Sequence, residues 1–335
     1  MNHFRDLIGQ DTILTHFKNA LEKDQVSHAY LLYGEKGTGK HSAAYLFARA
    51  LLCEENRGKA GRFEPCNRCH SCKMALSGNH LDIITVTHEK ASVLAVEEIR
   101  KQVINTIGEK PYGPRKIYII PDAELMKDQG KNALLKTLEE PPSYAVIILL
   151  SRNKEDMLAT IISRSVCLPT QPVKTEAIQT YLVDKCGIPE SKAYLPAALA
   201  QGNLGKALYL AQNEEMGEFM EDLISTLRSA PNIGPLKASE AAKNASAKKE
   251  FSETRLDMIL LWFRDVLFLK AGGHSSDLHF MEELKTLSGQ AEFYSFTDLN
   301  RILRMAEKTV SRDYYDINYE LSMEQLFLSM GVPKT

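Results

Sequence analysis

The chain has 335 residues, 44% of them hydrophobic, with 41 Lys and Arg against 43 Asp and Glu and a formal net charge of -2. This length predicts two or three domains, and the balanced charge excludes a global field that would draw the chain onto nucleic acid or an acidic membrane. The first residues lack a basic start followed by an apolar run, which excludes a secretory signal and predicts a cytoplasmic protein. The longest uncharged run of the most apolar late stretch, Met258 to Phe263, is too short to span a membrane.

The first 170 residues alternate between short apolar runs and helical stretches. The helical stretches are expected at residues 42–52, 96–107 and 132–138, the last stopped by Pro141 and Pro142. The continuously apolar runs predict strands that a parallel sheet buries on both faces: HAYLLYG (28–34), LDIITVT (81–87), RKIYII (115–120) and YAVIILLS (144–151). Strands separated by helices indicate a doubly wound α/β domain over residues 1–170.

The rest of the chain shows only helical periodicity. A small helical domain is expected at residues 171–214, and a second helical block at 215–335. In the second block, apolar residues between Leu256 and Leu267 recur at steps of three and four, which is typical of a packed helix.

A glycine-rich loop follows the first predicted strand. Gly34, Gly37 and Gly39 would let backbone N–H groups surround phosphate oxygens, and Lys40 could reach the terminal phosphates. The alternative is a glycine-rich turn without a ligand. Where a Mg²⁺-binding Ser or Thr is required after the lysine, the chain has His41, whose imidazole is a poor magnesium ligand. The loop therefore predicts no Mg²⁺ site and leaves ATP binding in doubt.

Four cysteines follow the helix after this loop. Cys53, Cys66, Cys69 and Cys72 can close a tetrahedral site, which predicts one structural Zn²⁺ in a module at about residues 53–80. Four protein thiolates would leave no open position for a substrate. An iron–sulfur cluster is the alternative, but no further cysteine follows with a proline behind it.

Two more motifs lie later in the first domain. NALLKTLEEPP (132–142) reads as a charged helix end stopped by prolines, and ATIISRS (159–165) carries Arg164 in a loop after the fourth predicted strand. An arginine at such a rim can stabilise phosphoryl charge on a neighbouring subunit's nucleotide. A lone arginine is more often a surface salt-bridge partner, so both roles stay open at this point.

Together, NALLKTLEEPP, the phosphate loop, the four-cysteine insertion and the Ser-Arg-Ser segment resemble the clamp-loader family of bacterial DNA polymerase III, which consists of AAA+ proteins. The resemblance extends from LIGQ at Leu7 to the C-terminal helices. Subunits of the delta-prime type fit better than the ATP-hydrolysing gamma/tau type. The family implies an AAA+ P-loop module with a zinc insertion, a helical lid at 171–214 and a helical collar at 215–335.

The chain departs from the family's ATPase pattern at three positions. Pro121 and Asp122 stand where active subunits carry an Asp-Glu pair, and Lys206 stands where they carry an arginine that contacts their own nucleotide. Together with His41, these residues favour a subunit without ATPase activity of its own. A gamma/tau-like subunit that hydrolyses ATP is the alternative.

The resemblance also implies a place in an assembly. Arg164 would act in trans as an arginine finger, with Ser165 in place of the family's cysteine. The expected partners are gamma/tau and delta subunits in a hetero-oligomeric ring, the sliding clamp and, through the complex, primed DNA. The chain would belong to the polymerase holoenzyme without being the polymerase. A free-standing zinc DNA-binding module is a further alternative, but the cysteine region mixes acidic and basic residues without a basic stripe.

Overall fold

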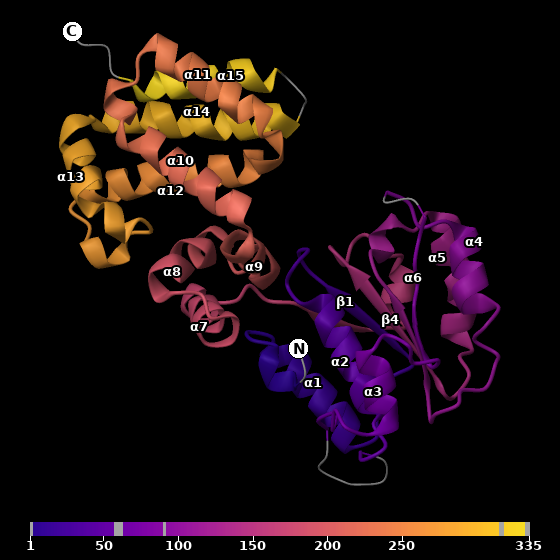
Figure 1. Cartoon of the computed structure of the whole chain (residues 1–335). Helices are drawn as coiled ribbons and strands as arrows, with labels where there is room; N and C mark the ends of the chain where they lie inside the picture. Colours follow the sequence, from indigo (N-terminus) through magenta and orange to yellow (C-terminus); the bar gives the residue numbers. More distant parts are fainter. Residues whose placement is uncertain (1–2, 57–62, 90–91, 315–317, 332–335) are drawn as a thin grey trace. The chain divides into compact units, whose positions relative to one another are not determined.

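The structure is a computed structural model that describes residues 3–56, 63–89, 92–314 and 318–331, with the backbone alone for 310–314. Residues 57–62, part of the loop that the cysteines are expected to tether, lie outside these ranges. The chain divides into two compact units (Figure 1). The first comprises Met1–Ile178 with Gln201–Gly205, and the second comprises Gln179–Ala200 with Lys206–Thr335.

A parallel five-stranded sheet with the strand order β2-β3-β4-β1-β5 forms the centre of the first unit. Its strands are β1 (Ala29–Tyr33), β2 (Ile83–Thr85), β3 (Lys116–Ile120), β4 (Ala145–Ser151) and β5 (Val166–Pro169). The prediction of four parallel strands is confirmed. The edge strand β5 is an addition that the sequence did not predict. It is short, pairs only with β1 and ends in a proline, which an edge strand tolerates.

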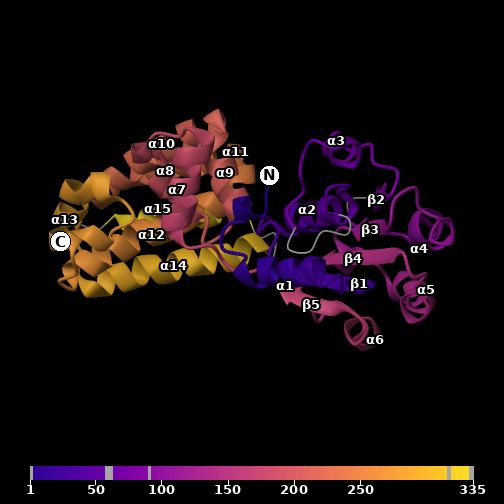
Figure 2. The same cartoon turned by 90° about the horizontal axis from the view of Figure 1, so that it is seen from below.

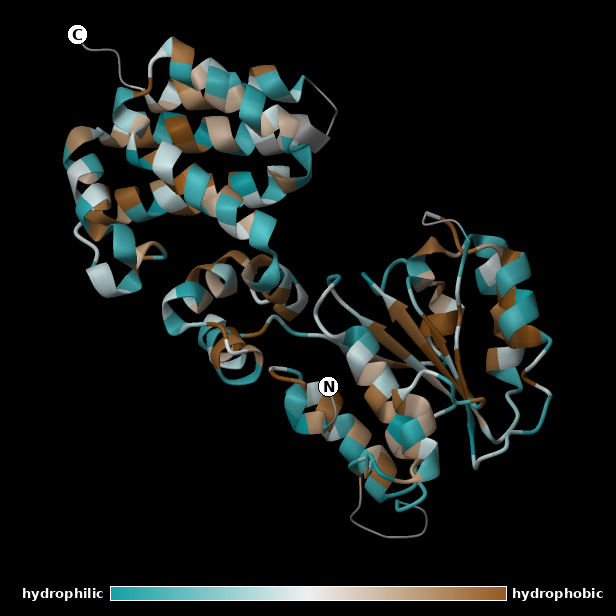
Figure 3. Ribbon diagram, viewed as in Figure 1, coloured by the Kyte–Doolittle hydropathy of each residue, from teal (hydrophilic) through white to brown (hydrophobic). Residues whose placement is uncertain are grey.

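Alternate strand residues face opposite layers of helices, as the doubly wound prediction requires. Tyr30 and Leu32 pack in one core with α1 (Asp11–Glu22) and α2 (Lys40–Leu52). Leu31 packs in the other core with α4 (Val96–Ile99) and α5 (Asp128–Glu139). Figure 2 shows the strands between α2 and α5, and Figure 3 shows that the strands are the most hydrophobic part of this unit.

The helices of the first unit differ slightly from their predicted bounds. The stretch expected at 96–107 is the short helix α4 followed by a π-helical turn, η2 (Arg100–Ile104). Residues 132–138 are part of the longer α5. The remaining elements are α3 (His70–Leu76), α6 (Ala159–Ile162) and the 3₁₀ turns η1 (Phe4–Asp6) and η3 (Ala123–Leu125).

Helices make up the second unit, as its periodicity predicts. Its core surrounds Trp262, whose indole N–H donates to Gln290 Oε1 at 2.8 Å. α7 (Thr175–Cys186) and α9 (Leu204–Gln212) begin in the first unit and end in the second. The others are α8 (Glu190–Leu199), α10 (Glu214–Arg228), α11 (Pro235–Ala247), α12 (Ser252–Lys270), α13 (Leu284–Phe293), α14 (Phe296–Tyr314) and α15 (Tyr319–Met330), with 3₁₀ turns η4 (Ala230–Asn232), η5 (Lys249–Phe251), η6 (Ser275–Asp277) and η7 (Met281–Glu283).

Most of the expected lid at 171–214 belongs to the same compact unit as the C-terminal helices, while 171–178 and 201–205 belong with the sheet. The division into domains at 1–170, 171–214 and 215–335 stays a prediction. Within the described ranges, no helix is both long and apolar enough to cross a bilayer.

Candidate functional site

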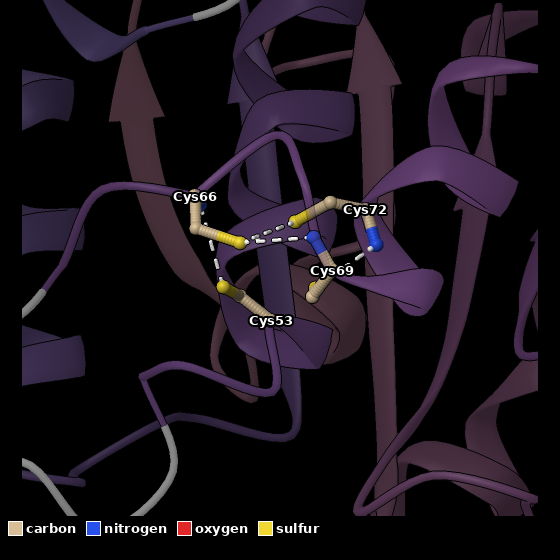
Figure 4. Close-up of side chains that lie close together, drawn as sticks. All are labelled: Cys53, Cys66, Cys69 and Cys72. Carbon is tan, nitrogen blue, oxygen red and sulfur yellow. Dashed lines mark hydrogen bonds between the residues drawn. The ribbon is translucent and has the colours of Figure 1, made fainter.

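The four predicted metal ligands lie together at the end of α2 and the start of α3 (Figure 4). Cys53 follows α2 directly, Cys69 is the N-cap of α3, and Cys72 lies in the first turn of α3. Their Sγ atoms lie within 4.8 Å of one another. Two sulfurs on a tetrahedral Zn²⁺ would be about 3.8 Å apart for Zn–S bonds of about 2.3 Å. The 4.0 Å between Cys66 Sγ and Cys72 Sγ is close to that separation.

Backbone N–H groups point at three of these sulfurs. Cys66 N donates to Cys53 Sγ at 3.4 Å, Cys69 N to Cys66 Sγ at 3.3 Å, and Cys72 N to Cys69 Sγ at 3.4 Å. Hydrogen bonds of this kind favour the thiolate over the thiol. Four converging thiols held in this way fit a structural zinc ion, which would bind all four and leave no position for a substrate.

The surroundings of the cysteines affect their protonation in opposite directions. Burial raises the pKa of the Cys53 and Cys72 thiols. Burial also acts to raise the pKa of Cys66, but hydrogen bonds from the backbone N–H groups of Arg68 and Cys69 outweigh it and lower that pKa. A metal ion that binds here must therefore displace protons from at least the two buried thiols.

Arg49 brings a positive charge to this cluster. It lies in the last turn of α2 with 2% of its surface exposed, close enough to Cys72 and Cys53 to interact with both electrostatically. Its guanidinium also donates to the side-chain oxygen of Asn67, in the loop between Cys66 and Cys69. Sequence spacing did not identify Arg49 as part of the site, although its position four residues before Cys53 places both on one face of the helix.

The phosphate loop has the backbone that its glycines predict. Gly34, Gly37 and Gly39, between β1 and α2, have φ values of 141°, 86° and 92°. Lys40 is the first residue of α2, but its Nζ is turned back onto the loop and donates to the carbonyls of Gly34 and, at 2.7 Å, Glu35. The amine that would contact phosphate is thus bound to the loop's own backbone.

A second segment of the first unit, residues 203–205, packs against this loop. Gly205 N donates to Gly37 O at 3.0 Å, and the Asn203 side-chain amide donates to Lys36 O. A Cβ on Gly37 would displace the Asn203 side chain, and the φ of 86° at Gly37 is a backbone conformation that strains any other residue. The sequence did not predict this contact, because nothing local in either segment indicates that the two meet.

Neither His41 nor Pro121 offers a side-chain oxygen at the positions where an ATPase would hold Mg²⁺. His41 stacks on Tyr45 with their rings 6.2 Å apart, and Pro121 follows the end of β3. Asp122 has a positive φ of 47° and lies 3.9 Å from His88 Nε2. The prediction of a missing magnesium site is consistent with this arrangement and stays a prediction.

A charged pair next to the loop was missed from the sequence. Glu124 lies in η3 and pairs with Arg152, just after β4, at 3.3 Å. Burial lowers the pKa of Lys40, and the carboxylates of Glu124, Glu35 and Asp122 partly offset this effect. Acidic groups therefore surround Lys40, where an ATPase would need room for phosphate and metal.

Arg164 lies just after α6 and is half-buried. Its guanidinium pairs with Glu139 Oε1 at 2.9 Å and donates to Thr160 O at 3.0 Å. Glu139 is the last residue of α5 and the first glutamate of the LEEPP segment, so the structure joins two motifs that were found separately. The finger role of Arg164 stays a prediction.

Lys206 is engaged within the second unit. Its Nζ lies 2.8 Å from Asp257 Oδ2 and 3.0 Å from Glu253 Oε1, both on α12. Burial acts to lower the pKa of Lys206, but the hydrogen bonds to these carboxylates outweigh it and raise the pKa. Lys206, which stands where the resemblance predicts an arginine in active subunits, is thus bound to two acidic side chains.

Comparison with known proteins places these features in a family. A family model described as "DNA polymerase III, delta subunit" matches residues 9–174. The DNA polymerase III subunit delta' of Bacillus subtilis is 31% identical over 327 residues, which cover 96% of both chains. The tau subunit of the same organism is 34% identical over 80% of this chain and 50% of its own length. Among solved structures, a gamma subunit-related protein of Thermotoga maritima covers 96% of this chain and 98% of its own, with 20% identity and a TM-score of 0.42.

The match to the delta' subunit extends over nearly the whole of both chains at more than 30% identity. It confirms the resemblance that the motifs of the first unit indicate. The chain therefore belongs to the delta-prime family of DNA polymerase III subunits.

Proposed function

We propose that this chain is a clamp-loader subunit that does not hydrolyse ATP itself and supplies Arg164 to the nucleotide of a neighbouring subunit. In this proposal residues 1–170 form an AAA+ module with structural Zn²⁺ on the four cysteines, residues 171–214 a lid, and residues 215–335 a collar. The chain would join gamma/tau and delta subunits in a ring in the cytoplasm and help to place the sliding clamp on primed DNA.

The state of the phosphate loop carries this proposal. Lys40 is bound by the carbonyls of Gly34 and Glu35, and Gly37 O accepts from Gly205 N. A nucleotide would have to replace the contacts of Lys40 with these carbonyls before its phosphates bound the amine. Because His41 and Pro121 stand in place of oxygen ligands, no bound metal ion would offset the free energy lost when these contacts break.

The ion pair of Arg164 with Glu139 does not prevent a role in trans. Both side chains are partly exposed, at 35% and 49%, and such pairs contribute about 0–1 kcal/mol. An arginine finger accelerates phosphoryl transfer by about 10³-fold or more, equivalent to ~4 kcal/mol. The transition state on a neighbour would therefore compete successfully with Glu139 for Arg164.

A gamma/tau-like motor is the second candidate, because a tau subunit is 34% identical over 80% of this chain and half of its own length. The two candidates differ in what the isolated chain does. A motor should turn over ATP faster than its own Lys40→Ala variant. The proposed subunit should show no difference between them.

The test of the finger is the ATPase rate of a reconstituted clamp loader that contains this chain. Arg164→Ala should lower the rate by at least tenfold, since arginine fingers contribute about 10³-fold or more. Arg115→Ala is the matched control, because Arg115 is also a partly exposed arginine of the first unit in an ion pair, with Asp24 at 3.2 Å.

Two results would contradict the proposal. If Arg164→Ala leaves the rate of the complex unchanged, Arg164 is only the salt-bridge partner of Glu139. If the isolated chain hydrolyses ATP and Lys40→Ala abolishes that activity, the chain is a motor.

A further inference from the structure

A cavity of about 730 Å³ lies within the second unit, away from every residue used above for nucleotide or metal. It is lined by α8, by α10 and by residues 279–283. Its apolar surface comes from Leu195 and Pro196 of α8, Met220 and Ile224 of α10, and Phe280. A cavity with an apolar floor of this size is suited to hold side chains of a ligand.

The wall of this cavity at residues 278–283 is held in place from three sides. Tyr194 Oη of α8 donates to Leu278 O at 3.2 Å. The buried carboxylate of Asp265 accepts from His279 N at 2.6 Å and from Phe280 N at 2.9 Å. Arg228, at the end of α10, pairs with Glu283, with 2.9 Å between Nε and Oε2. The cavity is therefore preformed, which lowers the ordering cost of binding.

The rim of the cavity is strongly acidic. Five exposed glutamates surround it, against Lys192 and the half-buried His279. Within the described part of the chain, none of the five has an ion-pair partner, whereas the sixth lining glutamate, Glu283, is paired with Arg228. The five are Glu190, Glu214, Glu218, Glu221 and Glu282.

The spacing of these charges indicates the shape of the ligand. Glu214, Glu218 and Glu221 lie along one side of α10 over two turns, a distance of about 10 Å at ~1.5 Å per residue. One small cation would neutralise a single point of this row. An extended peptide of three or four residues would follow its whole length.

We propose that this cavity docks a linear segment of a partner protein that inserts an apolar side chain between flanking lysines or arginines. The apolar floor would receive the apolar side chain, and the row on α10 would pair with the basic residues. The same negative charge repels nucleic acid and anionic lipid surfaces, so a basic peptide is the occupant that the rim favours. This proposal does not depend on the finger role of Arg164 or on the state of the phosphate loop.

The test is fluorescence anisotropy with the full chain and a short fluorescein-labelled peptide of leucine and lysine. Saturable binding is expected, and the same peptide with glutamate in place of lysine should not bind. The double variant E218K/E221K should weaken binding by about tenfold or more, because it reverses the charge that faces the lysines.

The double variant E215K/D222K is the matched control, since both residues are exposed on α10, make the same charge change and do not line the cavity. It should leave binding nearly unchanged. Ile224→Ser should weaken binding at unchanged charge, because Ile224 lines the floor that receives the leucine. An equal loss in both double variants, or no saturable binding to the wild-type chain, would overturn the proposal.

Discussion

Arg49 is a buried cation beside four thiols, and its charge needs compensation. Only 2% of its surface is exposed, and burial lowers the pKa of its guanidinium while the neighbouring Cys72 acts to raise it. An isolated buried charge is costly, but four thiolates around Zn²⁺ carry a net charge of about -2. Arg49 and the metal site would therefore stabilise each other.

This pairing leads to a prediction for zinc retention. Arg49→Met removes the charge but keeps much of the apolar volume, and it should weaken zinc binding by about tenfold, the lower end of the range for residues that surround a metal's ligands. Competition with a chromogenic chelator measures the effect. Arg49→Lys is the control and should retain most of the affinity, because it keeps the charge.

Two results would contradict this role for the charge of Arg49. If both Arg49 variants lose zinc to the same extent, the hydrogen bond from Arg49 to Asn67 matters and the charge does not. If neither loses zinc, Arg49 has no part in holding the metal.

For single residues, the sequence predicts the metal ligands better than the contacts that side chains make with distant parts of the chain. The close spacing of Cys66, Cys69 and Cys72 brings these three together, because a short loop and one helical turn constrain them, and Cys53 lies beside them in the structure. The pairing of Arg164 with Glu139 depends instead on how α5 and α6 pack, and no spacing rule expresses that contact.

Among the elements, the phosphate loop and the start of α9 are joined by an unusually close approach of two backbones. A Cβ on Gly205 would lie 3.0 Å from both Cα and O of Gly37. The hydrogen bond from Gly205 N to Gly37 O requires this closeness. The contact joins segments more than 160 residues apart in the chain, within one compact unit.

Gly205→Ala should therefore loosen the loop. The new methyl group forces the backbones apart, at an expected cost of ~1–3 kcal/mol, which exceeds the gain in helix propensity of about 0.5–1 kcal/mol. Hydrogen exchange of the loop amides should become faster by about tenfold or more. Gly217→Ala is the control, because a Cβ on that glycine of α10 would meet no atom within 4 Å, and the change should be neutral or stabilising.

Unchanged exchange in the Gly205→Ala chain would show that the contact between the two segments is weak. The proposal that the phosphate loop does not bind nucleotide in a form that can be hydrolysed would then rest, among the loop's contacts, on those of Lys40 alone.

As with single residues, an element can be predicted where its own sequence carries the signal. β1 consists of apolar and aromatic residues, and β4 is apolar up to Ser151, so their sequences reveal buried parallel strands. β5 has only three apolar residues, Val166 to Leu168, before Pro169, and it is half-buried along most of its length. So short an apolar run does not indicate a strand from the sequence alone. The π-helical turn η2 interrupts a stretch whose periodicity predicts one continuous helix.

In the whole molecule, the two units keep separate cores and separate sites. The cores of the first unit are built on the two faces of its sheet, and the core of the second surrounds Trp262. The cysteines and the phosphate loop belong to the first unit, and the acidic cavity to the second. The sequence predicts the change from strands to helices through the loss of strand signals after about residue 170, but the grouping of residues 201–205 with the sheet depends on tertiary contacts alone.

The separation predicts a local response to metal removal. Chelation should expose the sulfurs and the short helix α3, which has a small apolar contact surface of its own, and it should destabilise the first unit. If the metal contributes several kcal/mol, the unfolding temperature of that unit should fall by about 10 °C, at roughly 2–4 °C per kcal/mol for a unit of this size. Hydrogen exchange read by mass spectrometry should show faster exchange at residues 63–76 and in α2.

Peptides from α12 and α14 serve as the internal control in the same sample. Their exchange should stay unchanged, because their core contains no residue of the metal module. A uniform rise in exchange across α2, α3, α12 and α14 would instead mean that the two units unfold as one cooperative body. The zinc module would then contribute to the stability of the helical unit as well as to that of the first unit.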